Sequence, residues 1–203
     1  RLRQWVGLPA REWGYGQQAI VCTVRTAQSH RYTAWQRFSP TGPLAFLPLL
    51  SESGDEHFCS IVWSQDTEEA RRLMGLDDHA FKAELERAIE RELGAVDLVS
   101  RRYAFPLRQR HAKEYIAPGF ALVGDAAHVI HPLAGQGANL GLYDVQLLAS
   151  LIEKGQKENR PLGSLHVLNR YQHLSQTQSH QLGHLMTMIN QLFSNDQAGL
   201  QFL

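Results

Sequence analysis

The stretch 124–144 constrains the fold of this chain more than any other part of the sequence. A short apolar run over 120–123 leads into a glycine and an acid, and a loop with a proline then reaches Gly-Gln-Gly ahead of a long apolar segment, 138–152. A short apolar run ending in such residues is typical of a buried strand, and the later spacing is typical of a helix. The stretch therefore predicts a strand that passes through a loop into a long helix.

The glycines at the entry to this helix indicate a ligand. Gly135 and Gly137 come just before the apolar run, and glycine lets a ligand approach the backbone closely. The first amides of the helix, those of Gly137, Ala138 and Asn139, would lack partners inside the helix and point their N–H groups outward. We expect an electron-rich or anionic edge of a ligand at this position.

Asp125 predicts a second contact to the same ligand. It follows the buried strand directly, and a carboxylate at the carboxyl end of a strand accepts hydrogen bonds from the hydroxyl groups of a sugar or polyol. The helix entry and Asp125 together predict a ligand that carries a hydroxylated chain and an electron-rich ring.

The first half of the chain is predicted to form an antiparallel sheet with one covered face. β-Branched and aromatic residues recur there in short stretches bounded by Gly, Pro, Ser or Asp, as in successive strands. These stretches are 17–26, 31–38, 44–49, 57–63 and 96–107. Two helices, one capped by Asp66 and one over 78–93, are expected to cover the sheet. The segment 163–193 is predicted to form one long helix or two, and its uncharged polar face to pack on another domain or subunit.

Composition excludes several classes of protein. The 20 Lys+Arg and 20 Asp+Glu residues cancel, which argues against a nucleic-acid partner. Both cysteines lie in apolar stretches without ligand spacing, so neither a disulfide scaffold nor a zinc module is expected. His128 and His131 with Asp125 are too few for a metal site, and no metal is predicted. No long apolar run or signal segment occurs, which predicts a cytoplasmic chain.

The motif around the helix entry resembles the second FAD-binding motif of the single-component flavin aromatic hydroxylases. Its residues are Gly124 to His128, Pro132, Gly135 to Gly137, Asn139 and Asp144. Within that group, 37–49 and 105–107 resemble the FAD-dependent hydroxylases of ubiquinone biosynthesis, which are similar to p-hydroxybenzoate hydroxylase, and most of all the octaprenylphenol hydroxylases. Order and spacing match along nearly the whole chain.

The resemblance implies an α/β (α+β) fold with two parts. Residues 1–118 would form a substrate-binding domain, an antiparallel or mixed sheet covered by helices. Residues 119–203 would form the C-terminal part of a Rossmann-like FAD-binding domain and a long C-terminal helix. The Gly-x-Gly-x-x-Gly turn of the family is absent from this sequence, so we expect a fragment truncated at its N-terminus. It would lack the N-terminal half of its FAD domain and hold FAD poorly by itself.

The resemblance also implies roles for particular residues. The residues expected to bind FAD are Gly124, Asp125, Gly135, Gln136, Gly137, Ala138 and Asn139. Within this set Asp125 would hold the ribityl hydroxyls, and the amides of Ala138 and Asn139 would face the flavin ring. Pro132 and His131 would lie at the reaction centre. The apolar residues expected to line the substrate are Phe46, Leu47, Phe105 and Leu107.

The implied reaction is hydroxylation of the ring of a polyprenylated phenol in ubiquinone biosynthesis. O2 would react through a flavin C4a-hydroperoxide, and NAD(P)H or another reductant would supply electrons. The implied partners are the prenylated phenol and other proteins of the ubiquinone pathway in a biosynthetic complex, with the enzyme peripheral to the inner membrane. Two alternatives stay open: a related prenyl-lipid flavoprotein, such as an epoxidase or reductase, and a non-enzymatic module for prenyl-lipid binding or assembly.

Overall fold

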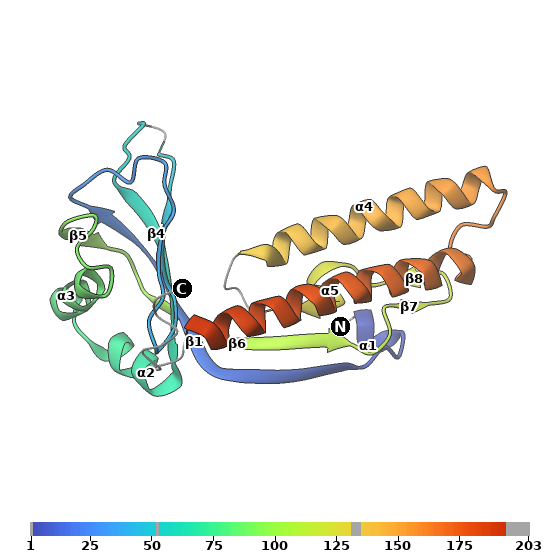
Figure 1. Cartoon of the computed structure of the whole chain (residues 1–203), viewed down its shortest axis with the longest axis horizontal. Coiled ribbons are helices and arrows are strands. Elements are labelled where there is room, and N and C mark those ends of the chain that lie inside the picture. Colours follow the sequence, from blue (N-terminus) through green and yellow to red (C-terminus); the bar gives the residue numbers. More distant parts are fainter. Residues whose placement is uncertain (1, 52, 131–134, 194–203) are drawn as a thin grey trace. The chain divides into compact units, whose positions relative to one another are not determined.

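The chain forms two compact units in a computed structural model that describes residues 2–51, 53–130 and 135–193. Unit 1 is built from Arg1–Tyr15 and Arg108–Asn190, and unit 2 chiefly from Gly16–Leu107. The two units divide between residues 15 and 16 and between residues 107 and 108, whereas the sequence predicts a domain boundary between 118 and 119. Two long strands each contribute to both units (Figure 1).

Unit 2 is an antiparallel sheet with two covering helices. Its elements are β2 (Trp35–Arg37), β3 (Leu44–Pro48), β4 (Phe58–Asp66), α2 (Thr67–Gly75), α3 (Asp78–Ala88), β5 (Val96–Val99) and the larger part of β1 (Ala10–Thr26). The strand order is β2-β3-β4-β1, and β5 pairs with β1. This confirms the predicted antiparallel sheet covered by helices.

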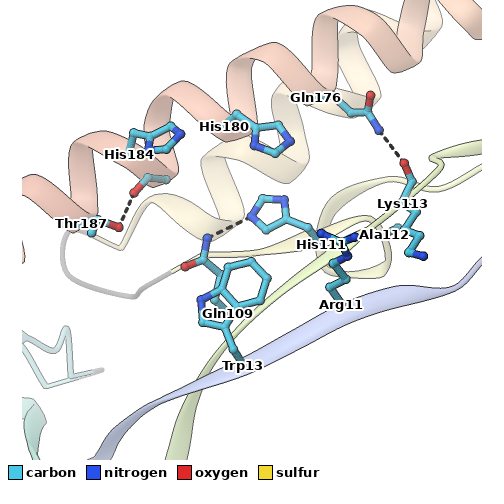
Figure 2. Close-up of a pocket in the computed structure, with 11 residues that line it drawn as sticks. Arg11, Trp13, Gln109, His111, Ala112, Lys113, Gln176, His180, His184 and Thr187 are labelled. Atoms are coloured by element: carbon cyan, nitrogen blue, oxygen red, sulfur yellow. Dashed lines mark hydrogen bonds between the residues drawn. The ribbon is translucent and has the colours of Figure 1, made fainter.

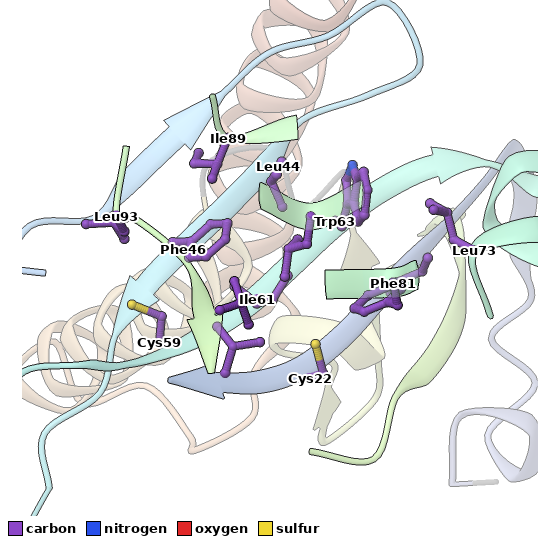
Figure 3. Close-up of a cluster of buried hydrophobic side chains, with 14 of the residues drawn as sticks. Cys22, Leu44, Phe46, Cys59, Ile61, Trp63, Leu73, Phe81, Ile89 and Leu93 are labelled. Atoms are coloured by element: carbon purple, nitrogen blue, oxygen red, sulfur yellow. The ribbon is translucent and has the colours of Figure 1, made fainter. Parts of the chain in front are cut away.

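One face of this sheet carries the core of unit 2. Cross-strand pairing places Phe46 opposite Ile61, and Ile61 opposite Cys22. Because side chains alternate along strands, these three residues point to the same face. They pack with Leu73 and Phe81 of the helices (Figure 3). Removing this apolar surface from water is the main stabilising contribution in such a layer.

Both cysteines are buried in this core and are free thiols. Burial raises the pKa of Cys22 and of Cys59 to about 11. No disulfide links them.

Unit 1 combines a narrow sheet with two long helices. Its elements are α1 (Leu2–Trp5), the start of β1, the end of β6 (Tyr103–Ala112), β7 (Ile116–Ala117), β8 (Phe120–Ala121), the 3-10 turn η1 (Gly124–Ala126), β9 (His128–Val129), α4 (Gln136–Lys157) and α5 (Leu165–Phe193). The strands follow the order β1-β6-β9. The segment after residue 163 is thus one helix, α5.

Some boundaries differ from the expected ones for identifiable reasons. The expected strand 31–38 is reduced to β2, because Arg31 and Tyr32 have positive φ angles of 52° and 54°. The helix expected over 78–93 ends at Ala88, and Glu90 and Arg91 adopt φ angles of 56° and 58°. Left-handed backbone continues neither a strand nor a helix. Residues 10–16 lack a periodic pattern in the sequence. They are nevertheless extended, because they pair with a neighbouring strand as part of β1.

Candidate functional site

The turn after residue 123 is shaped by glycine. Gly124 begins η1 with a φ of 55°, a left-handed value that glycine adopts without steric cost. A Cβ atom on Gly124 would lie 3.5 Å from the Cα of Gly141, and one on Gly141 would lie 3.3 Å from the Cα of Gly124. The two glycines therefore let η1 lie directly against α4. Asp125, the next residue of the turn, is exposed.

A buried carboxylate ties this turn to both long helices. Asp144 of α4 is fully buried. Its Oδ2 accepts hydrogen bonds from the Gly124 amide at 2.9 Å and from His128 Nε2 at 2.6 Å. Its Oδ1 accepts one from the Ser175 hydroxyl of α5 at 2.5 Å. We call Asp144, Gly124, His128 and Ser175 the Asp144 cluster.

The Asp144 cluster is arranged around a charged carboxylate. Burial alone would raise the pKa of Asp144, but the hydrogen bonds from His128, Ser175 and the Gly124 amide outweigh it, so this pKa lies below its usual value. An ionised carboxylate only accepts hydrogen bonds, so His128 Nε2 carries the proton of the bond between them. The position of the Gly124 amide is therefore set by an ionic, fully bonded cluster.

Two buried tyrosines secure the strand that leads into the turn. The Tyr171 hydroxyl of α5 donates to the Leu122 carbonyl at 2.6 Å. The Tyr115 and Ser179 hydroxyls lie 3.1 Å apart, and burial raises the pKa of Tyr115 to about 12. Both phenols are thus neutral hydrogen-bonding groups at physiological pH, and through them α5 holds the segment that precedes the turn.

The N-terminus of α4 is open with respect to the residues that the structure describes. Gly135 is its N-cap residue, with a φ of 60° and no capping side chain. A Cβ atom on Gly135 or Gly137 would meet no atom of the described residues within 4 Å. An α-helix leaves its first four amides without helical acceptors, here those of Gly135 to Ala138. The open backbone and these amides fit an electron-rich ligand edge.

The start of α4 changes the expected role of one residue. Because the helix begins at Gln136, two residues before the expected start, the Asn139 amide is the first that can bond to the Gly135 carbonyl. Its side-chain amide donates to Gln136 Oε1 at 3.1 Å. The backbone amides left for a ligand are therefore those before Asn139, including Ala138.

The structure brings the expected FAD-binding residues into one unit. All seven lie in η1 or at the start of α4, and the Gly124–Gly141 contact joins these two elements. His131 and Pro132 lie outside the described residues. Among the residues that are described, no group of three or more His, Cys, Asp or Glu side chains is placed to hold a metal ion.

The expected substrate-lining residues belong to unit 2 and do not share one face. Phe46 is fully buried in the core beneath the helices, whereas its neighbour Leu47 points the opposite way and is exposed. Alternation along β3 requires this difference. On β6, Phe105 is exposed and Leu107 is buried. Phe46 therefore supports the sheet from its core side.

Sequence reasoning did not assign a site role to Asp144 or to Ser175. Asp144 closes the motif, but its 20-residue separation from Gly124 hides their hydrogen bond. Ser175 lies on another helix and has no motif of its own. An acid at a position of α4 that faces the unit interior was the only available signal, because a buried acid needs hydrogen-bonding partners.

The overall fold is that of FAD-dependent monooxygenases. It superimposes with a TM-score of 0.76 on pqsL, a probable FAD-dependent monooxygenase from Pseudomonas aeruginosa, at 23% identity, over 100% of this chain and 56% of that one. Residues 9–181 match the FAD binding domain family, and the chain belongs to that family. This confirms the flavoprotein resemblance.

The chain is also similar to curated proteins that are named as hydroxylases of ubiquinone or its precursors. The chain is 36% identical over 203 residues to 3-demethoxyubiquinol 3-hydroxylase of Escherichia coli, covering 100% of this chain and 50% of that protein. It is 37% identical over 196 residues to ubiquinone hydroxylase UbiL of Rhodospirillum rubrum, covering 97% of this chain and 44% of that protein. The chain thus spans about half the length of the curated relatives it matches.

Proposed function

We propose that the full-length protein is a flavin-dependent monooxygenase that hydroxylates the aromatic ring of a polyprenylated phenol in ubiquinone biosynthesis. The observation that carries this proposal is the Asp144 cluster, which holds the Gly124 turn against a helix whose N-cap residue, Gly135, provides no capping side chain. The relatives named as ubiquinone hydroxylases support the reaction and the pathway.

In this proposal the described residues bind and orient the cofactor. Asp125, exposed in the turn, accepts hydrogen bonds from the ribityl hydroxyls of FAD. The amides of Gly137 and Ala138 in the first turn of α4, which have no acceptor within the helix, face the electron-rich edge of the ring, where the helix dipole favours negative charge. When bound, FAD supplies the activation of O2 and the transfer of oxygen, with NAD(P)H or another reductant as electron donor.

Four of the remaining sequence-predicted residues are assigned to the substrate. We place His131 and Pro132 at the reaction centre on the strength of the motif alone. The exposed side chains of Leu47 and Phe105 offer apolar surface to the phenol and its prenyl chain. Removing either one by alanine substitution should raise KM for a prenylated phenol and leave KM for an unprenylated analogue unchanged.

We further propose that the protein works at the inner membrane from the cytoplasmic side, beside other ubiquinone-pathway proteins. The support is the apolar substrate, which partitions into lipid. In the described part of the chain, no helix is both long and apolar enough to cross a membrane. Cell fractionation that finds the full-length protein only in the cytosol, without partner proteins, would contradict this placement.

A flavin titration tests the cofactor assignment. The full-length protein should bind FAD, and Asp125→Ala should weaken that affinity about tenfold, roughly 1.4 kcal/mol. Asp97→Ala is the matched control, because Asp97 is an exposed acid in unit 2 whose ion pair with Arg25 is solvent-exposed. The 203-residue chain measured alongside should bind FAD more weakly than the full-length protein.

The same proteins decide the reaction class. The full-length protein, reduced in the presence of O2, should convert a polyprenylated phenol into a product heavier by one oxygen atom, detected by mass spectrometry. A full-length protein without flavin absorbance would overturn the proposal. Flavin binding without oxygen incorporation would favour the related epoxidase or reductase.

A further inference from the structure

A second candidate site lies in unit 1, between α5 and the paired strands β1 and β6 (Figure 2). It is a cavity of about 630 Å³, a volume typical of small-molecule sites. Its lining residues are Arg11, Trp13, Gln109, His111, Ala112, Lys113, Gln176, His180, Gly183, His184 and Thr187. None of them belongs to the Gly124–Asn139 site or to the Asp144 cluster.

A chain of hydrogen bonds fixes which nitrogen of His111 carries its proton. The Tyr15 hydroxyl donates to Gln109 Oε1 at 2.5 Å, so the amide nitrogen of Gln109 faces away from Tyr15. That nitrogen lies 3.1 Å from His111 Nε2 and can only donate. His111 Nε2 is therefore the acceptor. In a neutral imidazole the proton then sits on Nδ1.

The Nδ1–H group of His111 is a buried donor without an acceptor. Only 9% of the side chain of His111 is exposed, and Nδ1 has no hydrogen-bond partner among the described residues. Burial lowers the pKa of His111 to about 4, with a further contribution from His180, so the ring is neutral at physiological pH. A buried donor that lacks an acceptor is destabilising, and a ligand oxygen would relieve that cost.

The charge of the lining indicates that this oxygen is anionic. Arg11 and Lys113 both line the cavity, and none of the aspartates or glutamates that the structure describes does. Within the described ranges, neither cation forms an ion pair with a carboxylate. The Glu12 carboxylate on β1 pairs instead with Arg108 and Arg110 on β6. Two positive charges without counter-ions beside a free N–H donor favour a carboxylate.

Aromatic rings form the other wall. The Trp13 ring stacks on His111 with centroids 6.0 Å apart, and His111 stacks on His180 at 5.1 Å, with interplanar angles of 19° and 20°. Figure 2 shows these rings coming from β1, β6 and α5. Trp13 and His180 keep exposed surface. Such near-parallel rings suit a flat aromatic ligand.

We propose that this cavity binds a planar aromatic carboxylate. The carboxylate accepts the Nδ1–H of His111 and lies between the charges of Arg11 and Lys113, while the ring packs against the exposed surface of Trp13. This site is separate from the flavin-binding residues, and its occupancy does not depend on the proposed function.

Calorimetric titration of the full-length protein with benzoate tests the proposal, with neutral benzamide as the comparison ligand. Benzoate should bind, and benzamide should bind at least tenfold more weakly. Arg11→Gln and His111→Phe should each weaken benzoate at least tenfold. Arg108→Gln is the matched control, because Arg108 points to the opposite face of β6 and pairs with Glu12; it should leave the affinity within twofold.

Several outcomes would overturn the site. These are equal affinity for benzoate and benzamide, equal losses in Arg11→Gln and Arg108→Gln, or no heat of benzoate binding up to about 10 mM. Arg11 is exposed, so its variant should fold and decides the question alone if His111→Phe does not fold. Flavin absorbance of Arg11→Gln should equal that of the parent protein, which separates failure here from failure of the flavin assignment.

Discussion

At the scale of single residues, the most demanding feature is a fully buried charge. Asp144 has no contact with solvent, yet three donors from three separate segments satisfy its oxygens. A buried charge is tolerated only with such complete hydrogen bonding, and removing part of the arrangement leaves the other members unpaired. The residue therefore has a structural and a positioning role, since one of its donors is the Gly124 amide.

We predict that Asp144→Asn lowers the free energy of unfolding by about 3 kcal/mol. An asparagine presents an N–H group to one of the three donors, so one hydrogen bond is lost and the Gly124 turn loosens. Flavin affinity should fall in parallel. Urea unfolding and flavin fluorescence measure the two effects. Glu153→Gln is the control on the same helix, because the Glu153–Lys157 pair is exposed. Asp144→Asn as stable as this control would show that the charge is not needed.

His111 predicts a pH dependence of stability. Its pKa is about 4 in the folded protein against an ordinary 6.5, so the unfolded chain binds the extra proton between these values. Stability from this group is complete above pH 6.5 and is lost as the pH falls from 6.5 to 4, on the order of 3 kcal/mol in total. The free energy of unfolding, measured with denaturant across this pH range, should change less with pH in His111→Phe than in the parent protein. An equal pH dependence in the two proteins would contradict the assignment.

At the scale of elements, local signals in the sequence predicted the strands and helices better than they predicted the contacts between those elements. The β1, β3 and β4 strands and the two long helices follow from periodicity, because each has a buried face. The positive φ angles that shorten β2 and α3 fall on arginine, tyrosine and glutamate, which carry no turn signal. The contact of Gly124 with Gly141 depends on how η1 packs on α4, which no local pattern encodes.

The glycine turn gives a prediction at this scale. Gly124→Ala should cost about 1 to 2 kcal/mol of stability, because φ is 55° there, and should weaken flavin binding by displacing η1 from α4. Gly119→Ala is matched in backbone strain, with a φ of 70° and open space around its Cβ position. It should be similarly destabilised but keep its flavin affinity. Thermal unfolding and flavin titration compare the two. Equal flavin affinity in both variants would mean that the turn does not position the cofactor.

At the scale of the whole molecule, the proposed functions are divided between the two units. The residues proposed to bind flavin and the cavity proposed to bind a carboxylate lie in unit 1, and Leu47 and Phe105, proposed to contact the substrate, lie in unit 2. The sequence motif identified the stretch proposed to bind flavin because its residues are close along the chain. It did not predict the cavity, whose lining comes from β1, β6 and α5 and is assembled only by the fold.

This division predicts that damage to the core of unit 2 spares flavin binding. Phe81 is fully buried, its ring lies 6.1 Å from that of Trp63, and the Arg102 guanidinium lies 4.7 Å above it. Phe81→Ala should lower the free energy of unfolding by about 3 to 5 kcal/mol. Flavin affinity of the full-length variant, measured well below its melting temperature, should match the parent, whereas hydroxylation should fall. A parallel loss of flavin would show that the two units act as one in binding.

The burial of Cys22 and Cys59 has a consequence for the oxygen chemistry proposed for the full-length protein. Flavin oxygenases whose oxygen transfer fails release hydrogen peroxide, and peroxide attacks thiolates far faster than thiols. With a pKa of about 11 and at most 4% of the residue exposed, both thiols stay protonated and shielded. The core of unit 2 is therefore protected from the most damaging by-product of the reaction proposed for this protein, without any need to eliminate sulfur from its sequence.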